Sequence, residues 1–188
     1  MSFFLHLLRH GAPELPGRMM GRTDVTPTRE GVAACVDQVG ELEIETLIAS
    51  DLRRASEAGA AIGALLGLPL STDPRWRELD FGEWDGLASS EIDPAALGRF
   101  WDDPDAHAPP QGERWSSLTA RVGAAVGDMA PRSTLVVTHG GAMRAALAVL
   151  CGFEQRQIWA FELGYASLVS LKVWPGDKPS AQIVGLRP

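Results

Sequence analysis

The sequence predicts an α/β fold, a three-layer sandwich in which helices cover both faces of a mostly parallel central sheet. Short apolar runs typical of buried strands alternate along the chain with segments whose apolar residues recur at helical spacing. The length of 188 residues suits one domain over residues 1–188. The stretch over about 73–113 is instead rich in Pro, Trp, Asp and Gly, and we expect it to form a cap-like insertion over the sheet.

The first half of the chain contains three predicted strands and two predicted helices. Phe3 to Leu8 is a short apolar run, as expected for a strand buried on both faces. Asp51 stands where its side chain can cap the second helix, and Gly67 stands where that helix is expected to end. In order, the elements are a strand over 3–8, a loop over 11–26, a helix from about Thr28, a strand over 47–50, the helix after Asp51 and a short strand over 69–71.

The second half continues the alternation after the cap. Within the cap, a short helix is expected after Asp93, because Pro94 suits the first turn of a helix. Apolar residues at helical spacing then predict a helix that contains Leu118 to Met129. The remaining elements are a strand over 134–138, a helix over 142–150 and two late strands near 167–173 and 182–186.

Composition and charge exclude several classes of partner. The chain is 45% hydrophobic and 22% charged, as in ordinary soluble proteins, and its net charge of −7 does not attract nucleic acid. No run of apolar residues is long enough to cross a membrane. Cys35 and Cys151 both lie in apolar stretches, which predicts buried side chains rather than a disulfide or a metal pair. We therefore expect a cytoplasmic protein without nucleic-acid or membrane partners, and a homodimer is left open.

Two predicted strands end on histidine followed by glycine. The first ends on Arg9-His10-Gly11, and the strand over 134–138 is followed by His139-Gly140-Gly141. The strand over 47–50 leads in the same way to Arg53 and Arg54. Ligands of parallel α/β sheets bind beyond the carboxyl ends of the strands, so we expect these side chains to meet at one edge of the sheet.

Such a set of residues can bind a phosphoryl group and attack it. Arginine donates paired hydrogen bonds to phosphate oxygens, and glycine lets backbone N–H groups approach them closely. A neutral imidazole can attack phosphorus and form a covalent phosphoenzyme. The leaving alkoxide then needs a proton, and Glu78 offers a carboxyl group beside Trp76 and Leu79. Asp80, Glu83 and Asp85 are the competing candidates for this acid.

Five segments, in order, resemble the histidine phosphatase superfamily, the branch that includes cofactor-dependent phosphoglycerate mutases and α-ribazole phosphatases. The resemblance spans essentially the whole chain. It implies that His10 is the nucleophile, that Arg9, Arg54 and His139 bind phosphate, that Glu78 is the proton donor and later the base, and that no metal or organic cofactor takes part. The segments are Leu8-Arg9-His10-Gly11, Gly21-x-x-Asp24 with Thr28-x-x-Gly31, Ser50-x-Leu52-x-Arg54-Ala55, Glu78-x-x-x-Gly82-x-Trp84-x-Gly86 and Val137-x-His139-Gly140-Gly141.

The chain departs from this family pattern at two places. Many members carry Ser or Thr and then Asn soon after Arg-His-Gly, where this chain has Ala12 to Gly17, and the usual Gly-Glu-Ser element lacks its serine at Arg114. Gly21 to Asp24 resembles a Gly-Arg-Thr-Asp stretch of α-ribazole phosphatases, which implies α-ribazole 5′-phosphate as a substrate and a role in cobalamin assembly. Arg18 and Arg22 could take over anion binding. The expected phosphate-binding residues are therefore Arg9, Gly11, Arg22, Thr23, Arg54, His139 and Gly140.

Three functions compete on this evidence. The preferred one is a phosphomonoesterase that acts on a small-molecule phosphate ester through phosphohistidine. A phosphoglycerate mutase would use the same chemistry, but the short chain and the Pro-rich loop after His10 favour water as the acceptor. A catalytically silent binding or scaffold protein would be expected to lack His10, Glu78 or His139, and all three are present. A metal hydrolase is disfavoured because none of the four histidines pairs with a second ligand at short spacing.

The other histidines and the tryptophans of the cap have less specific interpretations. His6 faces the interior of a strand and is expected to be a hydrogen-bonded core residue, whereas His107 is expected to face solvent. Four tryptophans are expected to be core residues of the cap, although one or two could form an apolar wall for the organic part of a substrate. They are Trp76, Trp84, Trp101 and Trp115.

Overall fold

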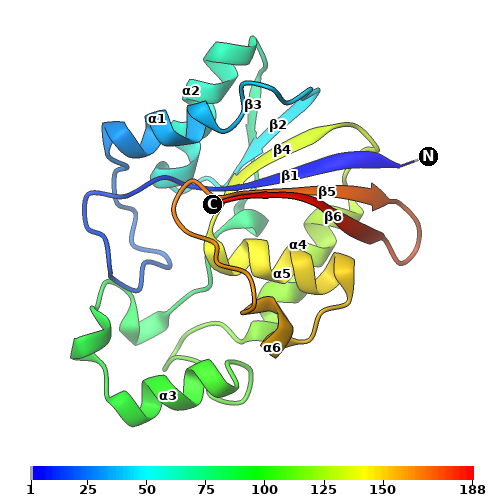
Figure 1. The fold of residues 1–188 in the computed structure, drawn as a ribbon. Helices are drawn as coiled ribbons and strands as arrows, with labels where there is room; N and C mark the ends of the chain where they lie inside the picture. Colours follow the sequence, from blue (N-terminus) through cyan, green and yellow to red (C-terminus); the bar gives the residue numbers. More distant parts are fainter. Residues whose placement is uncertain (1) are drawn as a thin grey trace.

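The computed structural model describes residues 2–188, and these residues form an α/β sandwich around one six-stranded sheet (Figure 1). The strands are β1 (Phe3–Arg9), β2 (Thr46–Ala49), β3 (Leu70–Thr72), β4 (Thr134–Thr138), β5 (Leu168–Trp174) and β6 (Ser180–Arg187). Their order in the sheet is β3-β2-β4-β1-β5-β6. The first four are parallel, whereas β5 pairs antiparallel with both β1 and β6. The sheet is therefore mixed but mostly parallel, as predicted.

Helices cover both faces of the sheet. On one face lie α1 (Arg29–Asp37) and α2 (Arg53–Leu66), and on the other lie α4 (Trp115–Gly127) and α5 (Gly140–Cys151) (Figure 1). Successive side chains of a strand point to opposite faces, so β1 contributes apolar residues to the hydrophobic core on both sides of the sheet. Leu5 and Leu7 join the core cluster that contains α4 and α5, whereas Leu8 joins the cluster that contains α1 and α2.

Local sequence signals explain most helix ends, with one correction. The Thr28 hydroxyl accepts a hydrogen bond from the Gly31 N–H at the start of α1, and Gly67 ends α2 in the left-handed conformation. The predicted cap at Asp51 is wrong: Leu52 is the N-cap of α2 and makes no side-chain hydrogen bond. The Asp51 carboxylate pairs instead with the guanidinium of Arg77, which lowers the pKa of Asp51. The guanidinium donates to both carboxylate oxygens, and such a bidentate pair adds geometric specificity as well as energy.

The stretch over 73–113 lies beyond the sheet, around one longer helix. That helix is α3 (Pro94–Asp102), and the Asp93 carboxylate caps it by accepting the Ala96 N–H at 2.9 Å. The rest consists of loops and three short turns, η1 (Pro74–Trp76), η2 (Gly82–Trp84) and η3 (Ser89–Glu91). The short helix α6 (Gln155–Ile158) was not predicted, because four residues leave no periodic pattern. The division into one domain with a cap stays a prediction.

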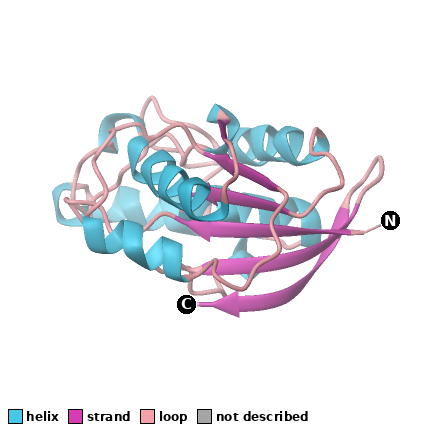
Figure 2. Cartoon of the chain, turned by 90° about the horizontal axis from the view of Figure 1, so that it is seen from above, coloured by secondary structure: helices cyan, strands magenta, loops and turns pink. Residues whose placement is uncertain are grey.

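The arrangement places most loops and short helices at one end of the sheet. Figure 2 shows them gathered at the end opposite the N-terminus, which is where the parallel strands finish. Both cysteines are free thiols, Cys35 buried in α1 and Cys151 half-buried at the end of α5. None of the helices within residues 2–188 has the length and apolar character needed to cross a bilayer.

Candidate active site

The two histidines that follow β1 and β4 lie against each other at the strand ends. The His10 N–H donates to the Thr138 carbonyl at 2.8 Å, which extends the pairing of β1 and β4 beyond the last strand residue. The ring centroids of His10 and His139 are 5.1 Å apart with an interplanar angle of 61°. Both side chains are buried. The structure thus brings together two imidazoles that are 129 positions apart in the sequence.

Hydrogen bonding and burial determine the protonation of the His10 ring. Its Nδ1 lies 2.8 Å from the carbonyl oxygen of Gly11, and because a carbonyl can only accept, Nδ1 carries the proton. The other ring nitrogen, Nε2, therefore keeps its lone pair. Burial, reinforced by the nearby charges of Arg54 and Arg9, lowers the pKa of His10 to about 3. The imidazole is neutral at physiological pH, as a nucleophile must be.

Buried nitrogen atoms without partners gather around His10. Within residues 2–188, six buried side-chain nitrogen or oxygen atoms have no hydrogen-bond partner, and five of them are nitrogens of Arg9, Arg54, His139 and Arg144. Leaving a buried donor unpaired costs about 1–3 kcal/mol. Such a concentration of unsatisfied donors at one place is expected where an anion completes the structure.

Arg54 is held rigidly by the backbone of a distant loop. Its Nη atoms donate to the carbonyl oxygens of Met20, Gly21 and Thr23 at 2.8 to 2.9 Å, and the side chain is fully buried. The Asp85 carboxylate secures this loop in turn by accepting the N–H groups of residues 21–23 at 2.5 to 3.3 Å. Both Nη atoms are thus engaged, whereas the buried Nε of Arg54 has no hydrogen-bond partner.

Arg22 and Thr23 have structural partners of their own. The Nε of Arg22 lies 3.2 Å from a carboxylate oxygen of Asp80, and Thr23 serves the loop through its backbone. Neither residue lines the pocket that contains His10. Direct binding of phosphate by Arg22 and Thr23 therefore stays a prediction.

Glu78 reaches the site from the chain that enters the cap. One carboxylate oxygen accepts the Gly141 N–H at 3.0 Å and the other accepts the Leu79 N–H at 2.8 Å. A Cβ at position 141 would overlap this carboxylate, so a side chain there would displace Glu78 from its present position at the start of α5. Glu78 and His10 line the same pocket.

The three competing acidic residues are engaged elsewhere. Asp80 pairs with Arg22 and accepts the N–H of Gly82, and Asp85 binds the loop that holds Arg54. Glu83 accepts a hydrogen bond from the side chain of Gln111. None of the three lines the pocket. Among the four candidates, only Glu78 lines the pocket.

The pocket has a polar floor and an apolar wall, and its volume is about 210 Å³. The floor includes two residues that sequence reasoning missed, Tyr165 and Arg144. Tyr165 lies against the His10 ring at 5.5 Å between centroids, and the Arg9 guanidinium lies 4.4 Å above its ring. Arg144 could have been found from the sequence, because it is the one charged residue of the otherwise apolar helix α5. Tyr165 lies in a loop and carried no pattern.

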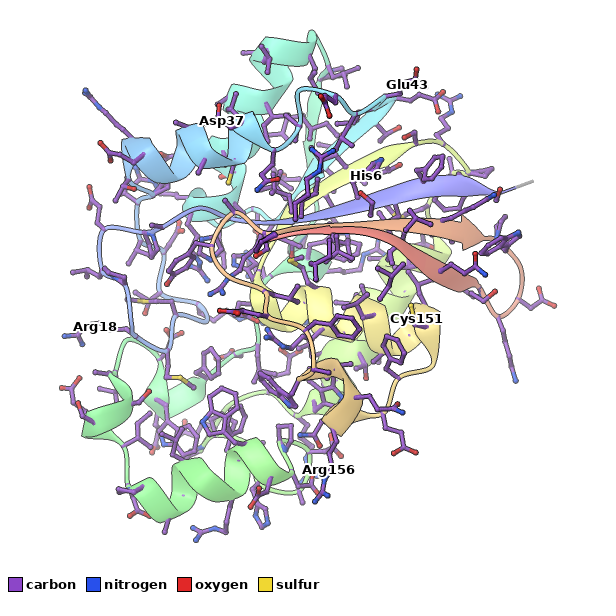
Figure 3. The ribbon with its side chains drawn as sticks, in the orientation of Figure 1. His6, Arg18, Asp37, Glu43, Cys151 and Arg156 are labelled. Carbon is purple, nitrogen blue, oxygen red and sulfur yellow. The ribbon has the colours of Figure 1, made fainter. Side chains whose placement is uncertain are left out.

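Arg18 lies at the rim of this pocket. Figure 3 shows its side chain extending from the loop after β1, beside the cap. It donates to the Gly86 carbonyl at 2.7 Å and pairs with Glu91 at 3.3 Å. Within residues 2–188, no three His, Cys, Asp or Glu side chains cluster closely enough to share a metal ion.

Sequence comparison adds a family and two kinds of relative. The profile of the histidine phosphatase superfamily, branch 1, matches residues 5–184. A glucosyl-3-phosphoglycerate phosphatase of Mycolicibacterium vanbaalenii is 32% identical over 166 residues, which cover 79% of this chain and 74% of the relative. A probable phosphoglycerate mutase of Enterobacter is 28% identical over 169 residues, with the same coverage. These names give no support to the expected kinship with α-ribazole phosphatases.

Solved structures with the same fold include one that holds phosphate. A mycobacterial glucosyl-3-phosphoglycerate phosphatase superposes with a TM-score of 0.87 at 27% identity, covering 98% of both chains. The complex of such an enzyme with inorganic phosphate gives a TM-score of 0.83 at 28% identity, covering 97% of this chain and 95% of the other.

Proposed function

The chain belongs to branch 1 of the histidine phosphatase superfamily, and on this premise we propose that it hydrolyses phosphate monoesters through a covalent phosphohistidine on His10. It is a phosphatase of small phosphate esters, like its glucosyl-3-phosphoglycerate phosphatase relatives. The observation that carries the proposed mechanism is the set of five unpaired buried nitrogens beside a neutral imidazole. A phosphoryl group would accept hydrogen bonds from the donors among them.

In the first step, Nε2 of His10 attacks phosphorus and the P–O bond of the ester breaks. The bonding electrons leave with the alkoxide, which takes a proton from the carboxyl group of Glu78 and departs as the alcohol. Arg9 and Arg54 stabilise the negative charge on the transferred group. His139 lies edge-on to the attacking ring, where it can contact the same group.

In the second step, water releases the phosphate. The Glu78 carboxylate takes a proton from a water molecule, the resulting hydroxide attacks phosphorus and the P–N bond breaks. The electrons of that bond return to Nε2, and inorganic phosphate leaves. Glu78 is again protonated and His10 is again neutral, so the cycle closes without an added cofactor.

Replacement of the nucleophile tests this proposal. His10→Ala should lower the hydrolysis of p-nitrophenyl phosphate by several orders of magnitude, because the covalent path is lost. His107→Ala, which removes a solvent-exposed histidine, is the matched control and should retain full activity. A rapid quench with ³²P-labelled ester should give an acid-labile, base-stable label on the wild type and none on His10→Ala. Substantial turnover by His10→Ala would exclude the phosphohistidine route.

The acceptor of the phosphoryl group separates the phosphatase from the mutase alternative. Trp101 and Trp159 of the pocket wall stay exposed to solvent, whereas a mutase must exclude water until the phosphate returns. Incubation with 3-phosphoglycerate and 2,3-bisphosphoglycerate should therefore release inorganic phosphate and form negligible 2-phosphoglycerate. Efficient formation of 2-phosphoglycerate without phosphate release would favour the mutase.

The natural ester is best sought among two candidates. Glucosyl-3-phosphoglycerate follows from the relatives, and α-ribazole 5′-phosphate follows from the Gly21 to Asp24 stretch. The two differ in the alcohol, a sugar acid in one and a ribose with an aromatic base in the other. Values of kcat/KM for both, measured side by side with phosphate release as the readout, decide between them.

A further inference from the structure

The wall of the pocket is built from aromatic residues that come from separate parts of the chain. Trp101 belongs to α3 in the cap, Trp159 directly follows α6, and Trp115 begins α4. In Figure 1, α3 and α6 lie on the same side of the molecule, away from the strands. The rings of Trp101 and Trp159 touch edge to face, with centroids 5.2 Å apart and an interplanar angle of 85°.

Neighbouring side chains hold these rings in fixed orientations. Trp101 packs edge to face on Phe100 at 4.8 Å between centroids. The guanidinium of Arg144 lies 4.4 Å above the ring of Trp159, a cation–π contact that connects the wall to the floor of the pocket. The wall is therefore preorganised, which lowers the entropic cost of binding a ligand against it.

The wall is apolar yet incompletely covered. Trp101 is 42% exposed and Trp159 is 41% exposed, although both rings line the pocket. Phe100, Trp115 and Leu118 extend the apolar lining. Large apolar side chains that stay open beside a few converging polar groups are typical of ligand sites.

The position of the wall relative to His10 identifies which part of a ligand would contact it. His10, Glu78, Arg9 and Arg144 line the pocket, and the buried His139 ring packs edge-on against His10, so the phosphoryl group is expected beside His10. The remaining part of the ester must extend from there along the pocket. Of the charged groups near the wall, Arg144 directs its Nη atoms to the carbonyl oxygens of Gly140 and Phe161, each at 3.4 Å. Arg18 is occupied by the Gly86 carbonyl and by Glu91. Few groups remain to bind the hydroxyls of a sugar.

We propose that the wall formed by Phe100, Trp101, Trp115 and Trp159 is a leaving-group subsite that selects phosphate monoesters of alcohols bearing an apolar ring. This inference rests on the proposed phosphatase activity and names the substrate class of the same pocket. Burial of the ring against the indoles provides the binding energy, at roughly 25 cal/mol for each Å² of apolar surface removed from water. The tryptophans of this wall thereby acquire a role in substrate selectivity.

Two esters with the same leaving-group chemistry test the subsite. Ethyl phosphate and 2-phenylethyl phosphate both release a primary alcohol, so they differ mainly in the ring. We expect kcat/KM of the wild type to be at least about tenfold higher for 2-phenylethyl phosphate, from apolar burial. Trp101→Leu and Trp159→Leu should each reduce this ratio severalfold, mainly through KM. Because the readout is a ratio, a general loss of folded enzyme cancels.

Trp174→Leu is the matched control. Trp174 is 39% exposed at the end of β5 and does not line the pocket, so its replacement should leave the ratio unchanged. Equal kcat/KM for the two esters in the wild type would overturn the subsite while leaving the phosphatase intact. Equal losses for both esters in the Trp101 and Trp159 variants would do the same. If the wild type hydrolyses neither these esters nor p-nitrophenyl phosphate, the proposed function itself fails.

Discussion

Asp85 positions the guanidinium of Arg54 through the backbone of a loop. The Asp85 carboxylate accepts the N–H groups of residues 21–23, while the carbonyl oxygens of Met20, Gly21 and Thr23 accept the Nη hydrogens of Arg54. The N–H groups of this segment therefore bind the Asp85 carboxylate, and its carbonyl oxygens bind the Arg54 guanidinium. We therefore expect Asp85 to act as a positioning residue for phosphate binding by Arg54.

We predict that Asp85→Asn weakens the site by loosening this loop. Hydrogen bonds to charged groups contribute about 1.5–3 kcal/mol, so kcat/KM for p-nitrophenyl phosphate should fall by about tenfold or more, and the inhibition constant of inorganic phosphate should rise in parallel. In a double-mutant cycle, Asp85→Asn should have little further effect in an Arg54→Ala background. Additive losses would contradict the positioning role. Glu57→Gln, which frees the neighbouring Arg53, is the control and should change neither constant.

We predict that Glu78→Gln discriminates between leaving groups. A poor alkoxide leaving group needs a proton in the transition state, whereas p-nitrophenolate hardly does. The variant should therefore lose far more activity toward an alkyl phosphate than toward p-nitrophenyl phosphate, as measured by kcat in steady-state assays. Asp80→Asn should show no such difference, because Asp80 faces Arg22 outside the pocket. Equal losses for both esters in Glu78→Gln would move the acid role to another residue.

We predict that the buried His10 lowers the stability of the fold in acid. Its pKa of about 3 in the folded state lies below the ordinary value of 6.5. Above pH 6.5 the ring is neutral in both states and contributes nothing, whereas between pH 6.5 and about 3 only the unfolded chain gains the proton. The free energy of unfolding should therefore fall as the pH is lowered, by roughly 2–3 kcal/mol between pH 7.5 and 4.5 from this residue.

Urea denaturation in phosphate-free buffer at these two pH values measures the effect. His10→Gln should lose less stability on acidification than the wild type, because the buried imidazole is gone. His107→Gln, at an exposed position, should behave like the wild type, and the titration of carboxylates cancels between the proteins. An identical loss in His10→Gln and the wild type would show that His10 is not held neutral.

Much of the fold follows from local signals in the sequence. The apolar run of β1, the start of α1 near Thr28 and the end of α2 at Gly67 depend on residues within a few positions of one another, and each is where it was expected. Asp51 was misassigned because its partner, Arg77, is 26 residues away. A helix cap is predicted from neighbouring residues alone, so the prediction fails where the side chain pairs with a cation that is distant in the sequence.

The residues at the strand ends were enough to predict the centre of the candidate site. The order of strands and helices brings the ends of β1, β2 and β4 to one edge, and the residues after those ends then have to meet there. The cations, the acid and the aromatic wall that complete this centre could be identified only from the packed structure. Arg54 depends on a loop some 30 residues earlier, Glu78 is distinguished from its neighbours by its contact with Gly141, and Tyr165 and the tryptophan wall converge from unconnected loops. Backbone periodicity predicts where strands end. The contacts of long side chains depend instead on distances in space, and these distances are set only when the layers pack.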